Sequence, residues 1–378
     1  MQFRDLHKQY QELKPEIDKG IQDVIDSTAF ILGKPVSDLE AELAEYVGRK
    51  HCVACANGTD ALVLALRVYD IGPGDAVFTA DFTYVASASC AELVGATSVF
   101  ADIDPRTFNI DPKSLEYQIE KVLKEGKLRP RAIVPVDLFG LPAEFKELER
   151  IAKKYNLIIV EDAAQGFGGN INGKRACSFG DISCTSFFPA KPLGCYGDGG
   201  AIFTDDDKVA ERLRSLRAGG KSPVDKYDNR EVGMNSRLDT IQAAILLPKF
   251  HAFRDYELDA VNKVAKWYDN RLKDVVITPY IPEGYLSSWA QYTVMLDNRA
   301  QRDALQARLK ENGIPSMVYY PRGMHQQQAF KNLELDGNDY PNAIEATNKV
   351  LSLPMHPYLS EEEVEYICSV IKKELKNL

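Results

Sequence analysis

An alternation of short apolar runs with amphipathic segments, extending over the first two thirds of the 378-residue chain, most constrains its fold. Residues 36–47, 143–155 and 206–217 place apolar side chains three and four positions apart, which predicts helices. The apolar runs end in polar residues and are, in order, HCVACAN, AVFTAD, TSVFADID, RAIVPVD, NLIIVED and ISCTSFF. This alternation predicts an α/β fold with a mainly parallel sheet and helices on both faces. Ligands of such a sheet gather at the carboxyl ends of its strands.

The pattern changes at about residue 250. A long amphipathic stretch, FHAFRDYELDAVNKVAKWYDNRL, is followed there by the proline-punctuated segment ITPYIPEGY. We therefore predict a large domain over residues 1–248 and a smaller α+β domain over residues 249–378, with the long stretch connecting them.

Composition and charge exclude several classes of protein. Hydrophobic residues make up 45% and charged residues 27% of the chain, which excludes disordered, collagen-like and coiled-coil proteins. The net charge of −9 argues against a broad surface for nucleic acid or anionic membranes. No apolar run approaches the roughly 18 residues of a membrane span, and the opening MQFRDLHKQY lacks the apolar core of a signal peptide, so we expect a cytoplasmic protein. Seven cysteines without framework spacing indicate reduced thiols.

Several common functional motifs fail at a key position. Residues 168–174 (GGNINGK) match GxxxxGK, but Arg175 stands where a nucleotide-binding loop needs Ser or Thr to hold Mg²⁺. Cys52 and Cys55 form a CxxC without the second pair that a zinc site requires. The chain has no GxGxxG after a strand, no HExxH and no GxSxG, and its five histidines lack ligand spacing. The sequence therefore argues against metalloenzymes, nicotinamide-dependent enzymes and serine hydrolases. An ATPase that uses residues 168–174 is a remote alternative.

One lysine stands in an unusual setting. Lys191 lies in the glycine- and proline-rich run TSFFPAKPLGCYGDGGA, flanked by aromatic and proline residues. An amine kept partly dry has a lowered pKa and can act as a Schiff-base nucleophile. The alternative is structural: a lysine that caps the loop or pairs with Asp198.

Pyridoxal phosphate needs an amine, an anion at its pyridine nitrogen and backbone N–H groups at its phosphate. Asp162, which ends the apolar run NLIIVED, can supply the anion, although an aspartate there also suits an N-cap. Residues 57–60 (NGTD) follow the run HCVACA and open the apolar segment ALVLALRVY, so they can present free amides to a phosphate, or form an ordinary cap.

Three further residues complete the constellation. Tyr84, in DFTYVAS, can stack on the cofactor ring, although an aromatic there also suits a core. Ser186, five residues before Lys191, can donate to the phosphate, and Gln165 can flank the ring. Along the chain, a Gly-Thr pair at a helix start is followed by an aspartate that ends a strand and then by a serine and a lysine. This order is the one expected if all of these residues bind a single cofactor.

The chain resembles the sugar aminotransferases of the DegT/DnrJ/EryC1/StrS family. The likeness runs through FILGKPVSDLEAELAEYVG, ANGTDAL, GPGDAVFTADFTYVAS, ADIDPRTFNID, EDAAQGFG, SFFPAKPLGCYGDGGAIFT, VGMNSRLDTIQAAIL, MVYYP and LSLPMHPYL, and so covers nearly the whole sequence. It implies the fold of the type I pyridoxal-phosphate-dependent transferases: a large domain with a mainly parallel seven-stranded sheet and a smaller C-terminal domain.

The resemblance implies a role for each matching residue. Lys191 matches the lysine that binds pyridoxal phosphate covalently and later moves a proton between substrate and cofactor. Asp162 matches the partner of the pyridine nitrogen, and Gln165 matches its neighbour at the ring. The remaining matches are three phosphate contacts, a stacking ring and an asparagine that reaches the neighbouring subunit's cofactor: Gly58, Thr59, Ser186, Tyr84 and Asn235. The asparagine implies a homodimer with shared sites.

The resemblance also implies a reaction. Dehydratases of the family carry histidine in place of Lys191, so the lysine favours transamination. By family precedent the amino donor is L-glutamate, and the acceptor is a keto group on a nucleotide-linked sugar. A relative that binds pyridoxal phosphate without transaminating stays open as an alternative.

The substrate follows from finer likeness. The segments around Lys191 and residues 235–249, with SLPMHPYL, look most like the subgroup acting on UDP-2-acetamido-2-deoxy-3-oxo-D-glucuronate in the synthesis of bacterial surface polysaccharides such as O-antigen lipopolysaccharide. Arg237 would then face the uronic carboxylate, or else form an interface salt bridge. Tyr319, Tyr320 and His325 would lie near the sugar, although the subgroup has histidine where this chain has Tyr319. The alternative substrate is a dTDP-linked 3- or 4-keto-6-deoxyhexose.

Overall fold

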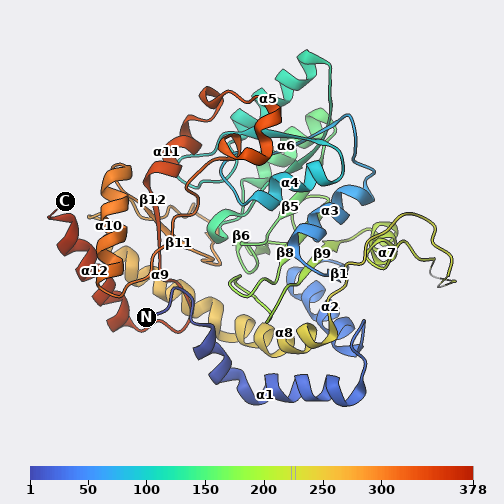
Figure 1. Ribbon diagram of the computed structural model, residues 1–378, viewed down its shortest axis with the longest axis horizontal. Helices are drawn as coiled ribbons and strands as arrows, with labels where there is room; N and C mark the ends of the chain where they lie inside the picture. The colour runs from blue at the N-terminus through green and yellow to red at the C-terminus, as the bar shows by residue number, and fades with distance from the viewer. Residues whose placement is uncertain (223, 226, 378) are drawn as a thin grey trace.

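The computed structural model describes residues 1–222, 224–225 and 227–377 (Figure 1). Its centre is a seven-stranded sheet in the order β1-β9-β8-β5-β4-β2-β3. The strands are β1 (His51–Cys55), β2 (Asp75–Ala80), β3 (Thr97–Ala101), β4 (Arg129–Val134), β5 (Ile158–Asp162), β8 (Ile182–Ser186) and β9 (Gly200–Thr204). Only β9 among them runs antiparallel to its neighbours β1 and β8. The predicted α/β fold with a mainly parallel sheet is confirmed.

Helices cover both faces of this sheet. On one face α3 (Gly58–Val68), α4 (Val85–Leu93) and α7 (Asp207–Leu216) share a buried core with the strands. The opposite face is covered by α2 (Lys34–Val47), α5 (Pro112–Glu125), α6 (Phe145–Tyr155) and α8 (Thr240–Ala252). The three helices predicted from apolar spacing thus correspond to α2, α6 and α7, because one apolar stripe on each packs onto the sheet.

The period of a strand separates the two cysteines of the CxxC. Cys55 packs into the core under α3, whereas Cys52 packs into the core under α2, on the opposite face of β1. Both thiols are buried and free, and burial raises the pKa of Cys55 to about 12. Successive strand residues alternate between faces, so two cysteines three positions apart cannot share a site on a regular strand.

The GxxxxGK segment forms a β-hairpin. Its residues lie in and around β6 (Asn170–Ile171) and β7 (Lys174–Arg175), which join β10 (Tyr285–Leu286) in a small three-stranded sheet. A nucleotide-binding loop instead connects a strand to the N-terminus of a helix.

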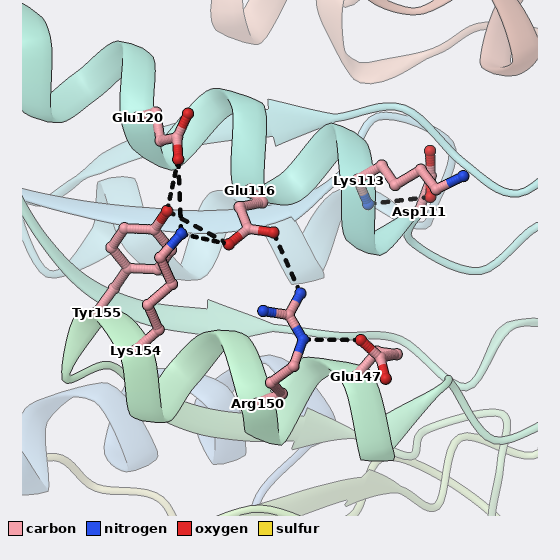
Figure 2. Close-up of polar contacts among 8 residues, drawn as sticks. All are labelled: Asp111, Lys113, Glu116, Glu120, Glu147, Arg150, Lys154 and Tyr155. Atoms are coloured by element: carbon pink, nitrogen blue, oxygen red, sulfur yellow. Dashed lines mark hydrogen bonds and ion pairs between the residues drawn. The ribbon is translucent and has the colours of Figure 1, made fainter.

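Charged side chains bridge the outer surfaces of α5 and α6 (Figure 2). Glu116 accepts hydrogen bonds from Arg150 (3.1 Å) and Lys154 (2.9 Å), and the Tyr155 hydroxyl donates to Glu120 (2.8 Å). Arg150 also pairs with Glu147 on its own helix at 2.8 Å. We call this group the α5–α6 network.

A long helical segment leads out of the sheet region. It comprises α8, a π-helical turn over Phe253–Glu257 and α9 (Leu258–Leu272), and it contains the amphipathic stretch seen in the sequence. Helix α1 (Leu6–Ser27) lies alongside α8 (Figure 1). The proposed domain boundary between residues 248 and 249 falls within α8, and the division remains a prediction.

The C-terminal part of the chain has its own core. Helices α9, α10 (Arg299–Glu311) and α12 (Glu361–Leu375) pack around the two-stranded sheet of β11 (Tyr292–Met295) and β12 (Val350–Leu353). Helix α11 (Pro341–Lys349) leads into β12, and short 3-10 turns occur at Leu138–Gly140, Met324–Gln326, Gln328–Leu333 and Gly337–Asp339. In the described ranges, no helix has the length and apolar character needed to cross a membrane.

Candidate active site

Three predicted site segments meet at one edge of the sheet. Strands β1, β8 and β5 all run in the same direction, so their carboxyl ends lie together. Ser186, at the end of β8, pairs with Gly200 of β9, and Gly200 pairs in turn with Cys55 at the end of β1. A Cβ on Gly58 would lie only 2.7 Å from the Ser186 Cβ, so this close approach requires glycine at position 58. The register therefore brings residues 57–60, Ser186 and Asp162 to one place.

The start of α3 offers unpaired donors. Asn57 caps the helix by accepting a hydrogen bond from the Asp60 amide at 2.8 Å. The amides of Gly58 and Thr59 donate to no acceptor among the described residues, and the Ser186 hydroxyl lies beside Gly58. A helix N-terminus with free amides and a neighbouring hydroxyl suits a phosphate. Residues 57–60 can cap the helix and bind an anion at the same time. The cap uses the Asn57 side chain and the Asp60 amide, whereas an anion would use the amides of Gly58 and Thr59.

Asp162 ends β5 with a buried carboxylate. Its Oδ2 accepts a hydrogen bond from Ser87 Oγ (2.7 Å), and its Oδ1 accepts one from the Ala164 amide (3.1 Å). Burial raises the pKa of Asp162, while these hydrogen bonds and the charge of Lys191 act in the opposite direction. Because burial disfavours the charged form of Asp162, a cationic partner would stabilise its carboxylate.

Sequence reasoning missed Ser87. It lies in the first turn of α4, one turn after Tyr84, and it reaches Asp162 across 75 positions of sequence. The spacing of Tyr84 and Ser87 places both on one side of the start of a helix. That spacing was the only local signal, and it does not identify the partner.

Lys191 lies in the loop between β8 and β9. Burial lowers the pKa of its amine, while Asp162 raises it and the charge of Arg4 lowers it further. The Nζ atom lies 5.8 Å from the centre of the Tyr84 ring. Nζ forms no ion pair with Asp198 or any other carboxylate in the part of the chain that the structure describes. A desolvated amine with no fixed partner is available as a nucleophile.

The aromatic and amide candidates border this amine. Tyr84 is 53% exposed, so its ring lies at the surface above Lys191 and not in a core. Gln165 is buried and held at both ends: its Oε1 accepts from the Phe139 amide (2.8 Å), and its Nε2 donates to the Tyr320 hydroxyl (3.0 Å). The structure thus joins Tyr320, a predicted sugar contact, to Gln165, a predicted ring contact.

His325 is already engaged by a carboxylate. Its Nδ1 lies 2.7 Å from Asp81 Oδ2, and its backbone amide donates to Asp81 Oδ1 at 2.7 Å. Its ring also stacks on Tyr340, with ring centres 5.0 Å apart. Tyr319 packs against Phe3 with ring centres 6.2 Å apart. Each of these candidates has a protein partner that the sequence did not predict.

Asn235 and Arg237 lie in a different setting. Asn235 is exposed and forms an isolated bridge with Ala218, and Arg237 is partly exposed. Within residues 1–222, 224–225 and 227–377, neither side chain hydrogen-bonds or ion-pairs with the group around Lys191, and Arg237 pairs with no carboxylate. The segment nevertheless lies beside the start of α3, because Ser236, between the two residues, is buried and accepts a hydrogen bond from the Ala56 amide at 3.2 Å.

The residues that do meet fit pyridoxal phosphate. The free amides of α3 and Ser186 suit its phosphate, the buried Asp162 carboxylate suits a protonated ring nitrogen, and the unpaired Lys191 amine suits its aldehyde. The exposed Tyr84 ring suits stacking on the cofactor ring.

Comparison with known proteins agrees with this chemistry. The model of the DegT/DnrJ/EryC1/StrS aminotransferase family matches residues 11–372. The UDP-2-acetamido-2-deoxy-3-oxo-D-glucuronate aminotransferase of Pseudomonas aeruginosa is 46% identical over 98% of this chain and 99% of its own length. The UDP-N-acetyl-3-dehydro-alpha-D-glucosamine 3-aminotransferase of Acidithiobacillus ferrooxidans is 41% identical over 98% of this chain and 97% of its own.

Solved structures show the same likeness. A family aminotransferase from Brucella abortus superposes with a TM-score of 0.96 at 46% identity, covering 99% of each chain. A Streptococcus pneumoniae sugar aminotransferase in its PMP form superposes with a TM-score of 0.88 at 26% identity, covering 96% of this chain and 97% of its own. The predicted cofactor and enzyme class are confirmed: the chain belongs to the DegT/DnrJ/EryC1/StrS family of pyridoxal-phosphate-dependent nucleotide-sugar aminotransferases.

Proposed function

We propose that the protein transfers an amino group from L-glutamate to the 3-keto group of UDP-2-acetamido-2-deoxy-3-oxo-D-glucuronate. The observation that carries this proposal is the 46% identity, over nearly the full length of both chains, with the P. aeruginosa enzyme of that name. The product would be a 3-amino sugar nucleotide for bacterial surface polysaccharide, made in the cytoplasm.

In this proposal the edge of the sheet holds the cofactor. Gly58 and Thr59 donate backbone N–H groups to its phosphate together with the Ser186 hydroxyl, which the close packing of Gly58 on Ser186 supports. Tyr84 stacks on the ring and Gln165 flanks it. When bound, pyridoxal phosphate supplies a protonated ring that withdraws electrons from the carbon bearing the amino group.

Asp162 and Lys191 carry the chemistry of the chain itself. The Asp162 carboxylate holds the proton on the ring nitrogen, and Ser87 and the Ala164 amide fix its orientation. Lys191 Nζ would take the proton from the substrate carbon and pass it to the cofactor, and accepting that proton requires a neutral amine. The burial that lowers the pKa of Lys191 favours that neutral form.

The acceptor would be held by the four predicted sugar contacts. Arg237 pairs with no carboxylate in the described chain, and its guanidinium fork suits the uronic carboxylate. Tyr319 and Tyr320 would line the sugar pocket, and His325, fixed by Asp81, would lie at its border.

We further propose a homodimer. The exposed Asn235 would reach the cofactor phosphate of the neighbouring subunit, so that each site is completed by two chains. Sedimentation of the purified protein tests the dimer, and Asn235→Ala should weaken cofactor binding without changing the sedimentation coefficient if the contact is only to the phosphate.

The substrate is tested by comparing acceptors. Purified protein is incubated with L-glutamate and, in turn, with UDP-2-acetamido-2-deoxy-3-oxo-D-glucuronate, its neutral 3-oxo-glucosamine analogue and dTDP-linked 3- or 4-keto-6-deoxyhexoses. We expect the uronic acceptor to give the highest kcat/KM. Turnover of only the dTDP sugars would refute the uronic assignment, and no change in cofactor absorbance on adding glutamate would indicate a non-transaminating relative.

Arg237 provides a second test. Arg237→Ala should raise KM for the uronic acceptor about 10- to 100-fold, the range expected for a lost charge-assisted hydrogen bond, and should leave KM for the neutral analogue unchanged. Equal effects on both acceptors would place Arg237 at an interface instead of at the sugar carboxylate.

A further inference from the structure

Phe3 and Arg4, close to the start of the chain, pack beside the candidate active site. The Phe3 ring lies 6.2 Å from the Tyr319 ring, and the Phe3 carbonyl accepts a hydrogen bond from the Met355 amide at 3.1 Å. Arg4 Nη2 donates to the carbonyl of Pro192, the residue directly after Lys191, at 3.4 Å. Arg4 therefore lies between the Lys191 loop and the C-terminal segment that carries Tyr319.

The Arg4 guanidinium is left with unused donors. A guanidinium has five N–H groups, and the single Pro192 contact occupies one of them. In the described ranges no carboxylate lies within 4.0 Å of Arg4, and burial lowers the pKa of Arg4 to about 10. Arg4 is half-buried, so its free N–H groups are open to a ligand, and a carboxylate could accept hydrogen bonds from them without displacing a protein partner.

The surroundings of Arg4 carry an excess of positive charge. Glu257 is the carboxylate whose charge acts on both Arg4 and Lys249, and its Oε1 accepts hydrogen bonds from Gln9 (2.8 Å) and Tyr358 (2.6 Å). Lys249 Nζ is buried, has no hydrogen-bond partner among the residues that the structure describes, and lies 4.7 Å from the centre of the Tyr196 ring. The half-buried Arg4 and the buried Lys249 thus share the charge of one carboxylate, which already accepts hydrogen bonds from neutral donors.

We propose that Arg4 binds a carboxylate of the substrate that reacts beside Lys191. This inference rests on the proposed function, in which the donor L-glutamate and the uronic acceptor both carry carboxylates. A guanidinium fork matches a carboxylate in two parallel hydrogen bonds. Because Arg237 is assigned to the uronic carboxylate, we expect the amino donor to be the source of the carboxylate at Arg4, and the experiment distinguishes it from the uronic acceptor.

The experiment compares Arg4→Gln with Lys8→Gln in the cofactor-loaded protein. Lys8 lies near Arg4 in the sequence and donates to the Tyr358 carbonyl at 3.0 Å on the exposed surface, so its variant is the matched control for the loss of one charge. Binding of glutarate, a dicarboxylate without an amino group, is measured by calorimetry. The glutamate half-reaction is followed by loss of the pyridoxal phosphate absorbance.

For Arg4→Gln we expect glutarate to bind about 10- to 100-fold more weakly. The glutamate concentration that gives half the maximal rate should rise by the same factor, and the maximal rate should stay within about threefold of wild type. Lys8→Gln should match wild type. Arg4→Lys, which keeps the charge but loses the fork, should fall between the two.

Two acceptor measurements identify the source of the carboxylate. If Arg4→Gln raises KM only for the uronic acceptor and not for its neutral analogue, the proposal stands with the sugar as source. Glutarate binding equal to that of Lys8→Gln, with equal effects on both acceptors, overturns it. The glutarate and glutamate measurements use no sugar, so they succeed or fail independently of the assigned acceptor.

Discussion

The α5–α6 network and the polar group around Asp162 differ in their exposure to solvent. In the α5–α6 network, Arg150 and Lys154 bridge to Glu116 with side chains that are 50% and 51% exposed (Figure 2). At the edge of the sheet, Asp162 is buried, and few groups approach it. The surface network has more ion pairs, and the buried group has larger consequences, because water screens the first and not the second. The following predictions test that difference, from the largest expected effect to the smallest.

Lys191→Ala should have the largest effect. Removing the amine removes both the nucleophile and the base, so we expect turnover to fall by about 10⁴-fold or more. Borohydride treatment of the cofactor-loaded wild-type protein should attach the cofactor to residue 191, and the variant should show no such adduct. Lys153→Ala, on exposed helix α6, is the matched control and should keep wild-type turnover. A variant with a rate close to normal would show that Lys191 is structural.

Asp162→Asn should come next. Asparagine keeps the size of the side chain and the acceptor for the Ala164 amide but loses the charge, so we expect kcat to fall by about 10²- to 10⁴-fold.

The same variant tests the effect of the buried charge on stability. Burial raises the pKa of Asp162 in the folded protein. The cofactor-free protein should therefore lose stability as the pH rises from the ordinary pKa of 3.8 through the raised pKa of the folded state, because the carboxyl group becomes charged while buried. The cofactor-free variant should therefore melt at or above the wild-type Tm at neutral pH. A lower Tm there would contradict this explanation of the buried charge.

Ser87→Ala should have an intermediate effect. The variant removes one of two hydrogen bonds that fix Asp162, and we expect kcat to fall about 3- to 30-fold. Ser87 Oγ also lies 3.3 Å from Thr83 Oγ1, but its shorter hydrogen bond is to Asp162. The pKa of the ring nitrogen, followed through the pH dependence of the cofactor spectrum, should therefore shift in the same variant. Ser89→Ala, on the same helix, should change neither quantity, and an unchanged spectrum in Ser87→Ala would assign Ser87 to packing alone.

Glu116→Gln should have the smallest effect. It breaks the pairs with Arg150 and Lys154 in the α5–α6 network, yet we expect Tm to change by only about 2 °C at low salt and less at 1 M salt. Turnover should not change. A loss of activity comparable with that of Ser87→Ala would contradict the difference drawn between the two groups.

Local patterns predicted much of this protein. The helices α2, α6 and α7 follow from apolar spacing, and six strands of the main sheet follow from apolar runs that end in polar residues. Asp162 could be placed at the carboxyl edge because it ends a predicted parallel strand, whereas Ser186 lies inside the predicted run ISCTSFF and was proposed from its spacing to Lys191. The antiparallel strand β9 was not among those runs, since glycine-rich loops precede it and its direction depends on pairing with β1 and β8.

Contacts across long stretches of sequence were decided by the tertiary structure alone. Ser87 meets Asp162 across 75 positions, Gln165 meets Tyr320 across 155, Arg4 meets Pro192 across 188, and Asp81 meets His325 across 244. No periodicity relates such pairs, because each depends on how the strands are ordered and how the C-terminal segment packs back onto the sheet. Sequence by itself determined which chemical groups the chain carries and on which elements they lie. Packing decided which carboxylate holds which donor, and which cation is left without one, because burial and partner geometry exist only once the chain has folded.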